Sequence, residues 1–192
     1  ETIYKAGTRP MGLLCLNQGK VKISRLGTNG MEQIVALKKP VDFIGFRTLM
    51  EEKYFLSSAV ALEPASICII NKDNFFKTIR NNANLAFKVI HILAKELNEL
   101  EGRLLNLTQK HVRARLADAL LIAHDVYGQS PNDGMLNVSL KRADLAALAN
   151  MTTANAIRVL SSFAKENVIE VDKRNIKIKD LNALNEISDW GR

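Results

Sequence analysis

A row of polar side chains between residues 153 and 162 has the chemistry needed to read the edges of DNA bases. It consists of Thr153, Asn155, Arg158 and Ser162, at spacings of two, three and four. An arginine can bond O6 and N7 of guanine together, and an asparagine can bond N6 and N7 of adenine in the same way. The row therefore predicts a helix edge that reads DNA sequence.

Hydroxyl groups and cations around this row are suited to binding phosphates. Phosphate contacts carry no sequence information, but they set the position of a protein on the duplex. The hydroxyl groups belong to Thr152, Thr153 and Ser161, and the cations to Lys141, Arg142, Lys173 and Arg174. Together with the reading row, these residues form the expected DNA-binding site.

Two short helices joined by a tight turn are expected to position the row. Each helix has one apolar face at helical spacing. The first face consists of Leu145, Leu148 and Ala149, and the second of Ala156, Val159, Leu160 and Phe163. Between the helices, Asn150 can adopt a left-handed backbone and Thr152 can cap the second helix. The pattern predicts a helix-turn-helix.

A β-hairpin with a basic tip is expected after the second helix. Ile169 and Val171 alternate with polar residues, residues 172–175 form a turn, and alternation resumes at Ile176. Before the motif we expect a helix over 112–126, a loop over 127–134 and a strand over 135–140. Together, the two helices, their turn and the hairpin match the pattern of a winged helix-turn-helix. The alternative is that two amphipathic helices and a hairpin only complete a fold.

The composition excludes a membrane protein and indicates an ordinary globular one. The chain has 192 residues, of which 47% are hydrophobic and 24% charged. No apolar run reaches the roughly 18 residues of a membrane span, and no charged-then-apolar leader opens the chain. We therefore expect a cytoplasmic location and no membrane partner. Because the chain begins with Glu1 and not Met, we expect it to be trimmed from a longer product.

A net charge of +7 favours an anionic partner such as DNA. The excess is uneven, because residues before 111 carry 16 Lys and Arg against 10 Asp and Glu. Residues 141–179 carry 8 against 4, so the expected DNA-binding segment is locally basic. Charge alone would not have located it.

The cysteines and histidines do not form a metal-binding or catalytic pattern. Cys15 and Cys68 lie in strand-like apolar runs, away from any CxxC motif, and we expect both to be buried as small hydrophobic residues. A metal-dependent barrel enzyme would need two or three histidines converging with a carboxylate. His91, His111 and His124 instead fall on predicted helices after the first 80 residues. We expect neither a metal site nor catalysis.

Short strands separated by glycine and proline are expected across the first 80 residues. They cover residues 13–16, 21–26, 31–37, 56–61 and 66–70. This spacing is typical of a small antiparallel barrel or jelly roll. A short helix with Phe75, Phe76 and Ile79 is expected to lead out of it.

One long helix is expected over residues 83–110. Its apolar residues repeat every four and three positions, at Ala86, Ile90, Leu93, Leu97, Leu100, Leu104 and Leu107. Such a repeat is typical of a coiled coil, and a helix of this length spans about 40 Å. We therefore expect a homodimer. The alternative is packing against the chain's own barrel, and Phe87, Val89 and Ile92 indicate that the first turns do both.

The order of barrel, long helix and winged helix-turn-helix resembles the Crp/Fnr family of bacterial regulators. The resemblance covers nearly the whole chain and is carried by residues 17–21, 42–45, 142–146 and 156–160 together with the long helix. We expect an α+β fold: an N-terminal antiparallel β jelly-roll, cyclic-nucleotide-binding-like domain (1–82), a dimerisation helix (83–110) and a C-terminal winged helix-turn-helix domain (111–192).

The resemblance also implies partners and a mechanism. Arg158 falls on the family's guanine-contacting arginine, so a palindromic double-stranded DNA operator is expected, with RNA polymerase as a further partner. Thr153 and Ala154 stand where relatives often have Arg or Val followed by Glu, which predicts a different half-site. Lys141 replaces the threonine that often caps the first helix. Binding of a signal molecule would change how the two DNA-reading helices of a dimer are held, and residues 106–110 are the expected hinge.

Departures from the family pattern predict an effector other than cyclic AMP. In members that bind cyclic AMP, a Glu follows the Phe-x-Gly segment and an Arg-Ser pair holds the phosphate, whereas here Phe46 follows Gly45 and Leu56 precedes Ser57. Leu100 and Glu101 occupy the positions that contact adenine in those members. Without a cation at the phosphate, the usual binding chemistry fails. The expected effector pocket consists of Gly45, Phe46, Leu56, Ser57 and Leu100.

Three alternatives share this architecture. Haem could bind between the barrel and the long helix with His91 as a ligand, although a packed or solvated helix histidine is the simpler interpretation. An iron-sulfur cluster would require cysteines before Glu1. The winged helix could also bind a protein, but the cations around the reading row favour phosphates.

Overall fold

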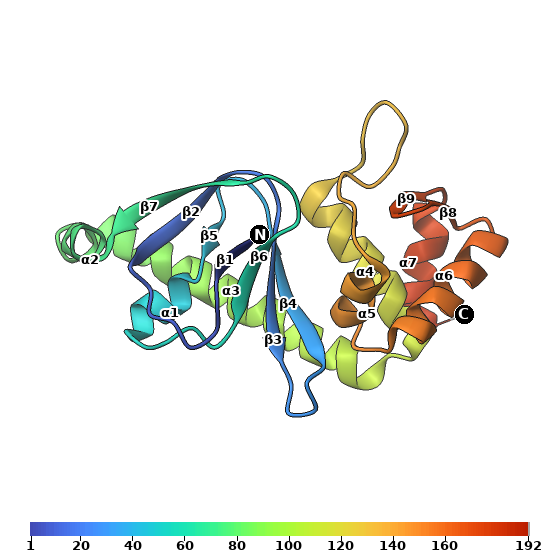
Figure 1. Ribbon diagram of the computed structural model, residues 1–192, viewed down its shortest axis with the longest axis horizontal. Helices are drawn as coiled ribbons and strands as arrows, with labels where there is room; N and C mark the ends of the chain where they lie inside the picture. Colours follow the sequence, from blue (N-terminus) through green and yellow to red (C-terminus); the bar gives the residue numbers. More distant parts are fainter. Residues whose placement is uncertain (192) are drawn as a thin grey trace. The chain divides into compact units, whose positions relative to one another are not determined.

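The computed structural model describes residues 1–191 and divides the chain into two compact units (Figure 1). The first unit contains residues 1–25 and 38–105, and the second contains residues 26–37 and those from 106 onward. Within the described part, no helix is both long enough and apolar enough to cross a membrane.

Antiparallel strands form the N-terminal β domain. One sheet places β6 (Ser58–Ala61) between β1 (Thr2–Tyr4) and β3 (Val21–Leu26), and a second places β2 (Gly12–Gln18) between β5 (Phe43–Ile44) and β7 (Ser66–Asn71). The strand β4 (Glu32–Lys38) follows β3 after a turn closed by the Gly27 amide, which donates to the carbonyl of Met31 at 2.9 Å. The predicted antiparallel β domain is confirmed.

Three helices complete the core of the first unit. They are α1 (Phe46–Glu51), α2 (Lys72–Arg80) and α3 (Ala83–Gln109), and their buried side chains meet Leu13 of β2 in one apolar cluster. The cluster contains Leu13, Phe46, Leu49, Phe75 and Val89. Two ion pairs add to it, because Glu96 of α3 accepts from Lys38 at 3.1 Å and lies 3.5 Å from Arg47. The first turns of α3 therefore pack on the barrel of the same chain.

The cysteines correct one sequence expectation. Cys15 is half-buried and Cys68 is exposed, so the predicted burial is wrong for Cys68 and only partly correct for Cys15. The apolar run around Cys68 forms β7, which pairs with β2 on one side only among the described strands. An edge strand has fewer neighbours to cover its side chains, and for this reason an apolar sequence is exposed here.

From residue 112 onward, the second unit consists of a helical core and a hairpin. The elements of this part are α4 (Val112–Tyr127), α5 (Arg142–Leu148), α6 (Thr153–Lys165), β8 (Ile169–Asp172), β9 (Asn175–Ile178) and α7 (Leu181–Trp190). Fully buried side chains from five of them form the core: Leu116, Leu120, Leu145, Leu148, Phe163, Ile169 and Leu184. The mixed helix and strand content confirms the predicted α+β class.

The predicted strand over residues 135–140 is wrong. Leu136, Val138 and Leu140 are all buried, which explains the alternating pattern. However, only isolated bridges form, between Gln129 and Leu136 and between Met135 and Lys177. Alternation reports which side chains are buried, and an extended segment can bury every second side chain without a partner strand.

Gly102 should be a site where one added methyl group stabilises the protein. It lies inside α3, is exposed, and an added Cβ would meet nothing within 4 Å. Because glycine in a helix interior costs about 0.5–1 kcal/mol relative to alanine, we expect Gly102→Ala to raise the free energy of unfolding by that amount. Urea denaturation followed by circular dichroism measures it, and an unchanged or lower midpoint would contradict the expectation.

Candidate nucleic-acid interface

The turn between α5 and α6 is fixed by local hydrogen bonds. The carboxylate of Asp144 accepts from the backbone N–H of Lys141 at 3.0 Å, which closes the start of α5 without a threonine cap. Asn150 has φ 51°, the left-handed backbone that the sequence predicted. Thr152 then caps α6, because its Oγ1 accepts from the N–H of Asn155 at 3.2 Å. The predicted turn chemistry is confirmed.

The helix α6 buries one face and exposes the other. The buried face lies in the core of the second unit and consists of Ala156, Val159, Leu160 and Phe163. On the outer face Thr153, Ala154, Ile157, Arg158 and Ser161 are exposed. One terminal nitrogen of Arg158 donates to the Asn155 side-chain oxygen at 2.9 Å. The structure therefore brings together the two side chains with bidentate base-reading chemistry and holds them in one orientation.

Ile157 is a candidate contact that the sequence interpretation missed. It lies beside Arg158 on the outer face of α6, and its side chain is 48% exposed. An apolar side chain in the major groove can contact the methyl group of thymine. The sequence did contain a signal for this contact, because Ile157 is an apolar residue within a row of polar ones.

Ser162 lies in an internal network rather than at the outer edge. Its hydroxyl donates to Glu166 at 2.6 Å and accepts from Arg113 at 3.1 Å. Arg113 also pairs with Glu166, and its guanidinium lies 4.8 Å from the centre of the Phe163 ring. These hydrogen bonds hold the pKa of Glu166 below its usual value. The structure thus places Ser162 in a link between α4 and the end of α6.

Two arginines position the motif itself. Arg142 donates to the carbonyl of Lys173 at 2.6 Å and ties the start of α5 to the turn of the hairpin. Partial burial lowers the pKa of this guanidinium. Arg115 of α4 donates to the carbonyl of Asn150 at 2.7 Å and so supports the interhelical turn. The sequence alone did not indicate the role of Arg115.

The remaining predicted contacts lie at the surface. Thr152, Lys141, Lys173 and Arg174 are exposed, and Ser161 donates to the carbonyl of Ile157 at 3.0 Å. Lys173 and Arg174 form the two-residue turn between β8 and β9, and Lys173 has φ 52°. Cations therefore lie at the start of α5, on α6 and at the wing tip, where phosphates flank a helix placed in a groove.

The predicted effector residues lie in different surroundings. Phe46 is part of the apolar core, Leu56 is exposed, and Leu100 is half-buried. Gly45 has φ 69°, and an added Cβ would lie 2.4 Å from the Phe55 ring. Phe55 stacks on Tyr4 with ring centres 3.7 Å apart, and burial raises the pKa of the Tyr4 phenol, which hydrogen-bonds Ser57. Aromatic rings therefore fill the space behind Gly45.

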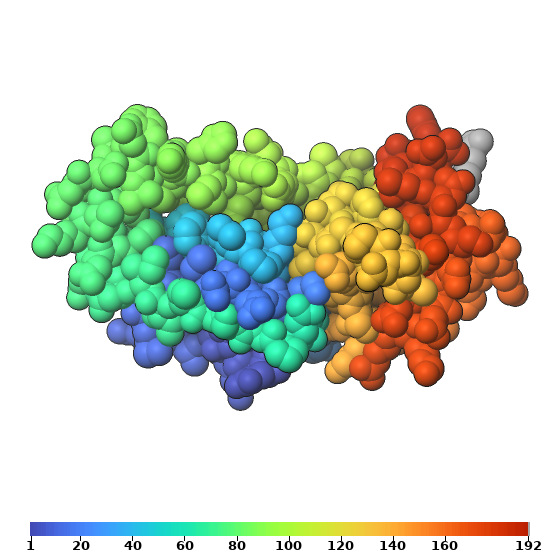
Figure 2. Space-filling model, turned by 90° about the horizontal axis from the view of Figure 1, so that it is seen from above, coloured from blue at the N-terminus to red at the C-terminus, as the bar shows by residue number. Residues whose placement is uncertain are grey.

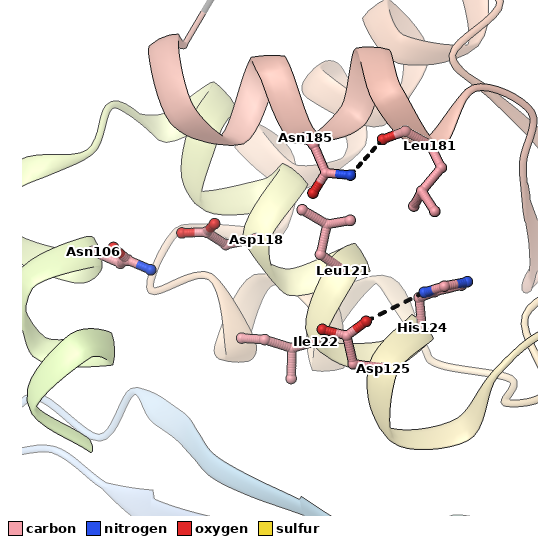
Figure 3. A pocket seen from close by; sticks show the side chains of 8 residues that line it. All are labelled: Asn106, Asp118, Leu121, Ile122, His124, Asp125, Leu181 and Asn185. Carbon is pink, nitrogen blue, oxygen red and sulfur yellow. Dashed lines mark hydrogen bonds and ion pairs between the residues drawn. The ribbon is translucent and has the colours of Figure 1, made fainter. Parts of the chain in front are cut away.

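Two of the cavities among the described residues lie elsewhere. The first, of about 290 Å³, is in the second unit between α4, α7 and the end of α3 (Figure 3). It is lined by Asn106, Asp118, Leu121, Ile122, His124, Asp125, Leu181 and Asn185. The other, of about 330 Å³, borders α2 and includes Lys72, Phe76, Lys77 and Arg80. None of the five predicted effector residues is among the residues that line these two cavities.

The predicted dimer seam of α3 splits between two faces. Leu93 packs against the barrel core, and Ala86, Leu100 and Leu107 are half-buried. Ile90, Leu97 and Leu104 are exposed. The exposed side continues instead through Phe87 and Ala94. We call Phe87, Ile90, Ala94 and Leu97 the exposed α3 stripe.

The predicted hinge is mostly helical. The helix α3 continues through Gln109, and the break is confined to Lys110 and His111. Lys110 donates to Asp118 of α4 at 2.9 Å and to Ser188 of α7 at 3.1 Å. The second unit therefore holds the end of this segment by polar contacts.

Comparison with known proteins assigns both halves of the chain. Residues 1–82 match the family model of the cyclic nucleotide-binding domain, and residues 114–187 match that of the Crp-like helix-turn-helix domain. A cyclic AMP receptor protein of Thermus thermophilus is 27% identical over 189 residues, which cover 98% of this chain and 84% of that protein. An anaerobic regulatory protein of Haemophilus influenzae is 26% identical over 191 residues, or 98% and 73% of the two chains.

Solved structures show the same fold. FixK2 from Bradyrhizobium japonicum superposes with a TM-score of 0.83 at 22% identity, covering 97% of this chain and 91% of that one. A CRP-family transcriptional regulator of Thermus thermophilus gives 0.83 at 22% identity, with 98% and 93% coverage. With a cyclic nucleotide-binding domain followed by a DNA-binding Crp-like helix-turn-helix, the chain belongs to the Crp/Fnr family of transcription regulators.

Proposed function

We propose that this regulator acts as a homodimer that binds a palindromic operator and responds to an effector other than cyclic AMP. The observation that carries the proposal is the Asn155–Arg158 pair, held together on the exposed face of α6 in a helix-turn-helix. We assign the sensing role to residues 1–82, dimerisation to 83–110 and DNA binding to 111–192. RNA polymerase would be a further partner, because a regulator bound at a promoter either contacts or excludes it.

The exposed α3 stripe supports the homodimer. Its large side chains, Phe87, Ile90 and Leu97, are 57% to 71% exposed in the single chain. In the space-filling view α3 forms one long edge of the first unit, open to the outside (Figure 2). A row of apolar side chains at spacings of three and four is the pattern that a second, identical helix covers. This row shares Ile90 and Leu97 with the predicted seam and replaces Ala86 and Leu93 by Phe87 and Ala94.

The surroundings of Gly45 support an effector other than cyclic AMP. A cyclic phosphate requires a cation or several N–H donors, and the exposed Leu56 supplies no charge. The nearby cation, Arg47, lies 3.5 Å from the carboxylate of Glu96. Phe46 is buried in the apolar core, and the Ser57 side chain is hydrogen-bonded to the Tyr4 phenol. Neither side chain therefore offers a free group to a cyclic phosphate.

Calorimetric titration of the full chain with cyclic AMP should therefore give no binding heat. The Thermus thermophilus relative, whose name is cyclic AMP receptor protein, provides the positive control under the same conditions. Saturable binding of cyclic AMP in the micromolar range would contradict the proposal that the effector is a different molecule.

Selection from randomised duplex DNA tests the proposed DNA function. We expect an inverted repeat whose half-site centres are about 34 Å apart, one helical turn, because a two-fold dimer presents two copies of α6. If 6–10 phosphates are neutralised, affinity should fall by about 10³–10⁵ between 50 and 200 mM salt. Fluorescence anisotropy on the selected site measures this slope. The absence of any enriched sequence at low salt would refute sequence-specific binding.

A further inference from the structure

The two cysteines of the chain, distant in sequence, are neighbours in the β domain. Cys15 lies in β2 and Cys68 in β7, and the antiparallel pairing of these strands places the two residues directly opposite each other. The adjacent pairs are Leu14 with Ile69 and Leu16 with Ile67. Directly opposed residues project their side chains to the same face of a sheet. Both thiols therefore lie on one face of the sheet. The two strands that carry them, β2 and β7, run side by side in Figure 1.

The backbone spacing at this pair suits a disulfide. The N–H and C=O of Leu16 bond toward residues 41 and 42, since Leu16 donates to the Asp42 carbonyl at 3.0 Å and accepts from Val41 at 2.8 Å. Backbone groups alternate in direction along a strand, so those of Cys15 point toward β7. A hydrogen-bonded antiparallel pair has Cα atoms about 5.5 Å apart, within the roughly 4.4–6.8 Å of protein disulfides.

The pair is also open to reagents. Cys68 is exposed and Cys15 is half-buried, and both are free thiols. On its other side Cys15 is opposite Phe43 of β5, and its Sγ lies 4.0 Å from the carbonyl of Val41. A thiol reagent can therefore reach Cys68 first, and Cys15 lies next to it on the adjacent strand.

We propose that Cys15 and Cys68 form a reversible thiol–disulfide site that is oxidised by small-molecule disulfides. The Cys68 thiolate attacks one sulfur of the small disulfide, whose S–S bond breaks and releases one small thiolate. The Cys15 thiolate then attacks Sγ of Cys68 in this mixed disulfide, so the Cys15–Cys68 bond forms while the bond to the second small thiolate breaks and that thiolate leaves. The protein loses two electrons and two protons, and the small disulfide becomes two thiols.

The site differs from a structural disulfide in its expected lability. Directly opposed residues have Cβ atoms about 4.5–5.5 Å apart, whereas a disulfide brings them to about 3.5–4.5 Å. Closing the bond must draw β7 slightly toward β2. A bond that shifts its strands is more easily reduced, which suits a reversible modification. Because β7 leads directly into α2 and then α3, the bond would act on the strand that precedes the helix with the exposed α3 stripe.

Oxidised glutathione is the test reagent. The folded full chain is incubated with it, remaining thiols are alkylated, and peptides are mapped by mass spectrometry without reduction. We expect both free thiols to disappear into one intramolecular Cys15–Cys68 bond that dithiothreitol reverses. A stable glutathione adduct on Cys68 beside a free Cys15, or a disulfide that joins two chains, would overturn the proposal.

A register control separates geometry from simple reactivity. The double variant Cys68→Ser with Ile69→Cys moves the second thiol by one residue, to the opposite face of the same strand. Ile69 is 57% exposed, so the new thiol stays accessible and little apolar packing is lost. We expect a mixed disulfide at the new cysteine and an unmodified Cys15. Equal formation of an intramolecular bond in this variant would also overturn the proposal, and circular dichroism checks that both proteins are folded.

Discussion

Replacement of Leu97 by glutamate should separate the proposed dimer into single chains and thereby weaken operator binding. In a symmetric pair the exposed α3 stripe meets its own copy, so each variant dimer would bring together two carboxylates in an apolar seam. Burying unpaired like charges is strongly unfavourable. Joining two binding modules raises affinity by about 10²–10⁴-fold, and we expect Leu97→Glu to lose a factor of that order. Sedimentation velocity and fluorescence anisotropy measure the two effects.

Gly102→Glu provides the matched control for this experiment. It adds the same charge to the same helix, but in open space on an exposed position outside the stripe. We expect it to remain dimeric and to bind the operator normally. A Leu97→Glu protein that sediments as a dimer would exclude the exposed α3 stripe as the interface.

Replacement of Arg158 by alanine should cost about 1–3 kcal/mol in binding for each half-site and relax the preference at one base pair. The guanidinium is already oriented by Asn155 at 2.9 Å, so little conformational entropy is lost when it meets a base. A dimer carries two copies of the change, which makes the total loss on a palindrome roughly twice as large. Selection from randomised DNA reports the base preference, and anisotropy reports the affinity.

Arg174→Ala is the comparison variant, because Arg174 lies at the exposed wing tip and is expected to contact phosphate. It should weaken binding to all sequences alike and lower the salt slope by about one for each lost contact. If Arg158→Ala behaves in the same way, with its base preference intact, Arg158 binds phosphate and does not read sequence.

Local chemistry made much of the second unit predictable. Asn150 takes the left-handed backbone and Thr152 caps α6 because both properties depend on a few neighbouring residues. The order of β domain, long helix and helix-turn-helix was predictable for the same reason, since each period of apolar residues spans one element. Short elements such as β1, β5 and α1 escaped prediction, because two to six residues contain too little of a period.

Contacts between distant residues were not predictable. Ser162 belonged to the predicted reading row by its spacing, yet Arg113 and Glu166 hold it in an internal network. Leu93 fitted a heptad, but it packs on the barrel, and Phe87 takes an exposed place beside Ile90. The spacing of apolar residues shows that a helix has an apolar side but not which part of it faces the chain's own core.

The sequence by itself determined the helix-turn-helix, its turn, its cap and the residues able to read bases, because these follow from side-chain chemistry and periodicity within a few turns. Only the tertiary structure decided that Cys15 faces Cys68, that Arg142 supports the wing and that α3 leaves Phe87, Ile90 and Leu97 uncovered. The physical reason is that strand register and helix rotation are set by the packing of segments far apart in the chain.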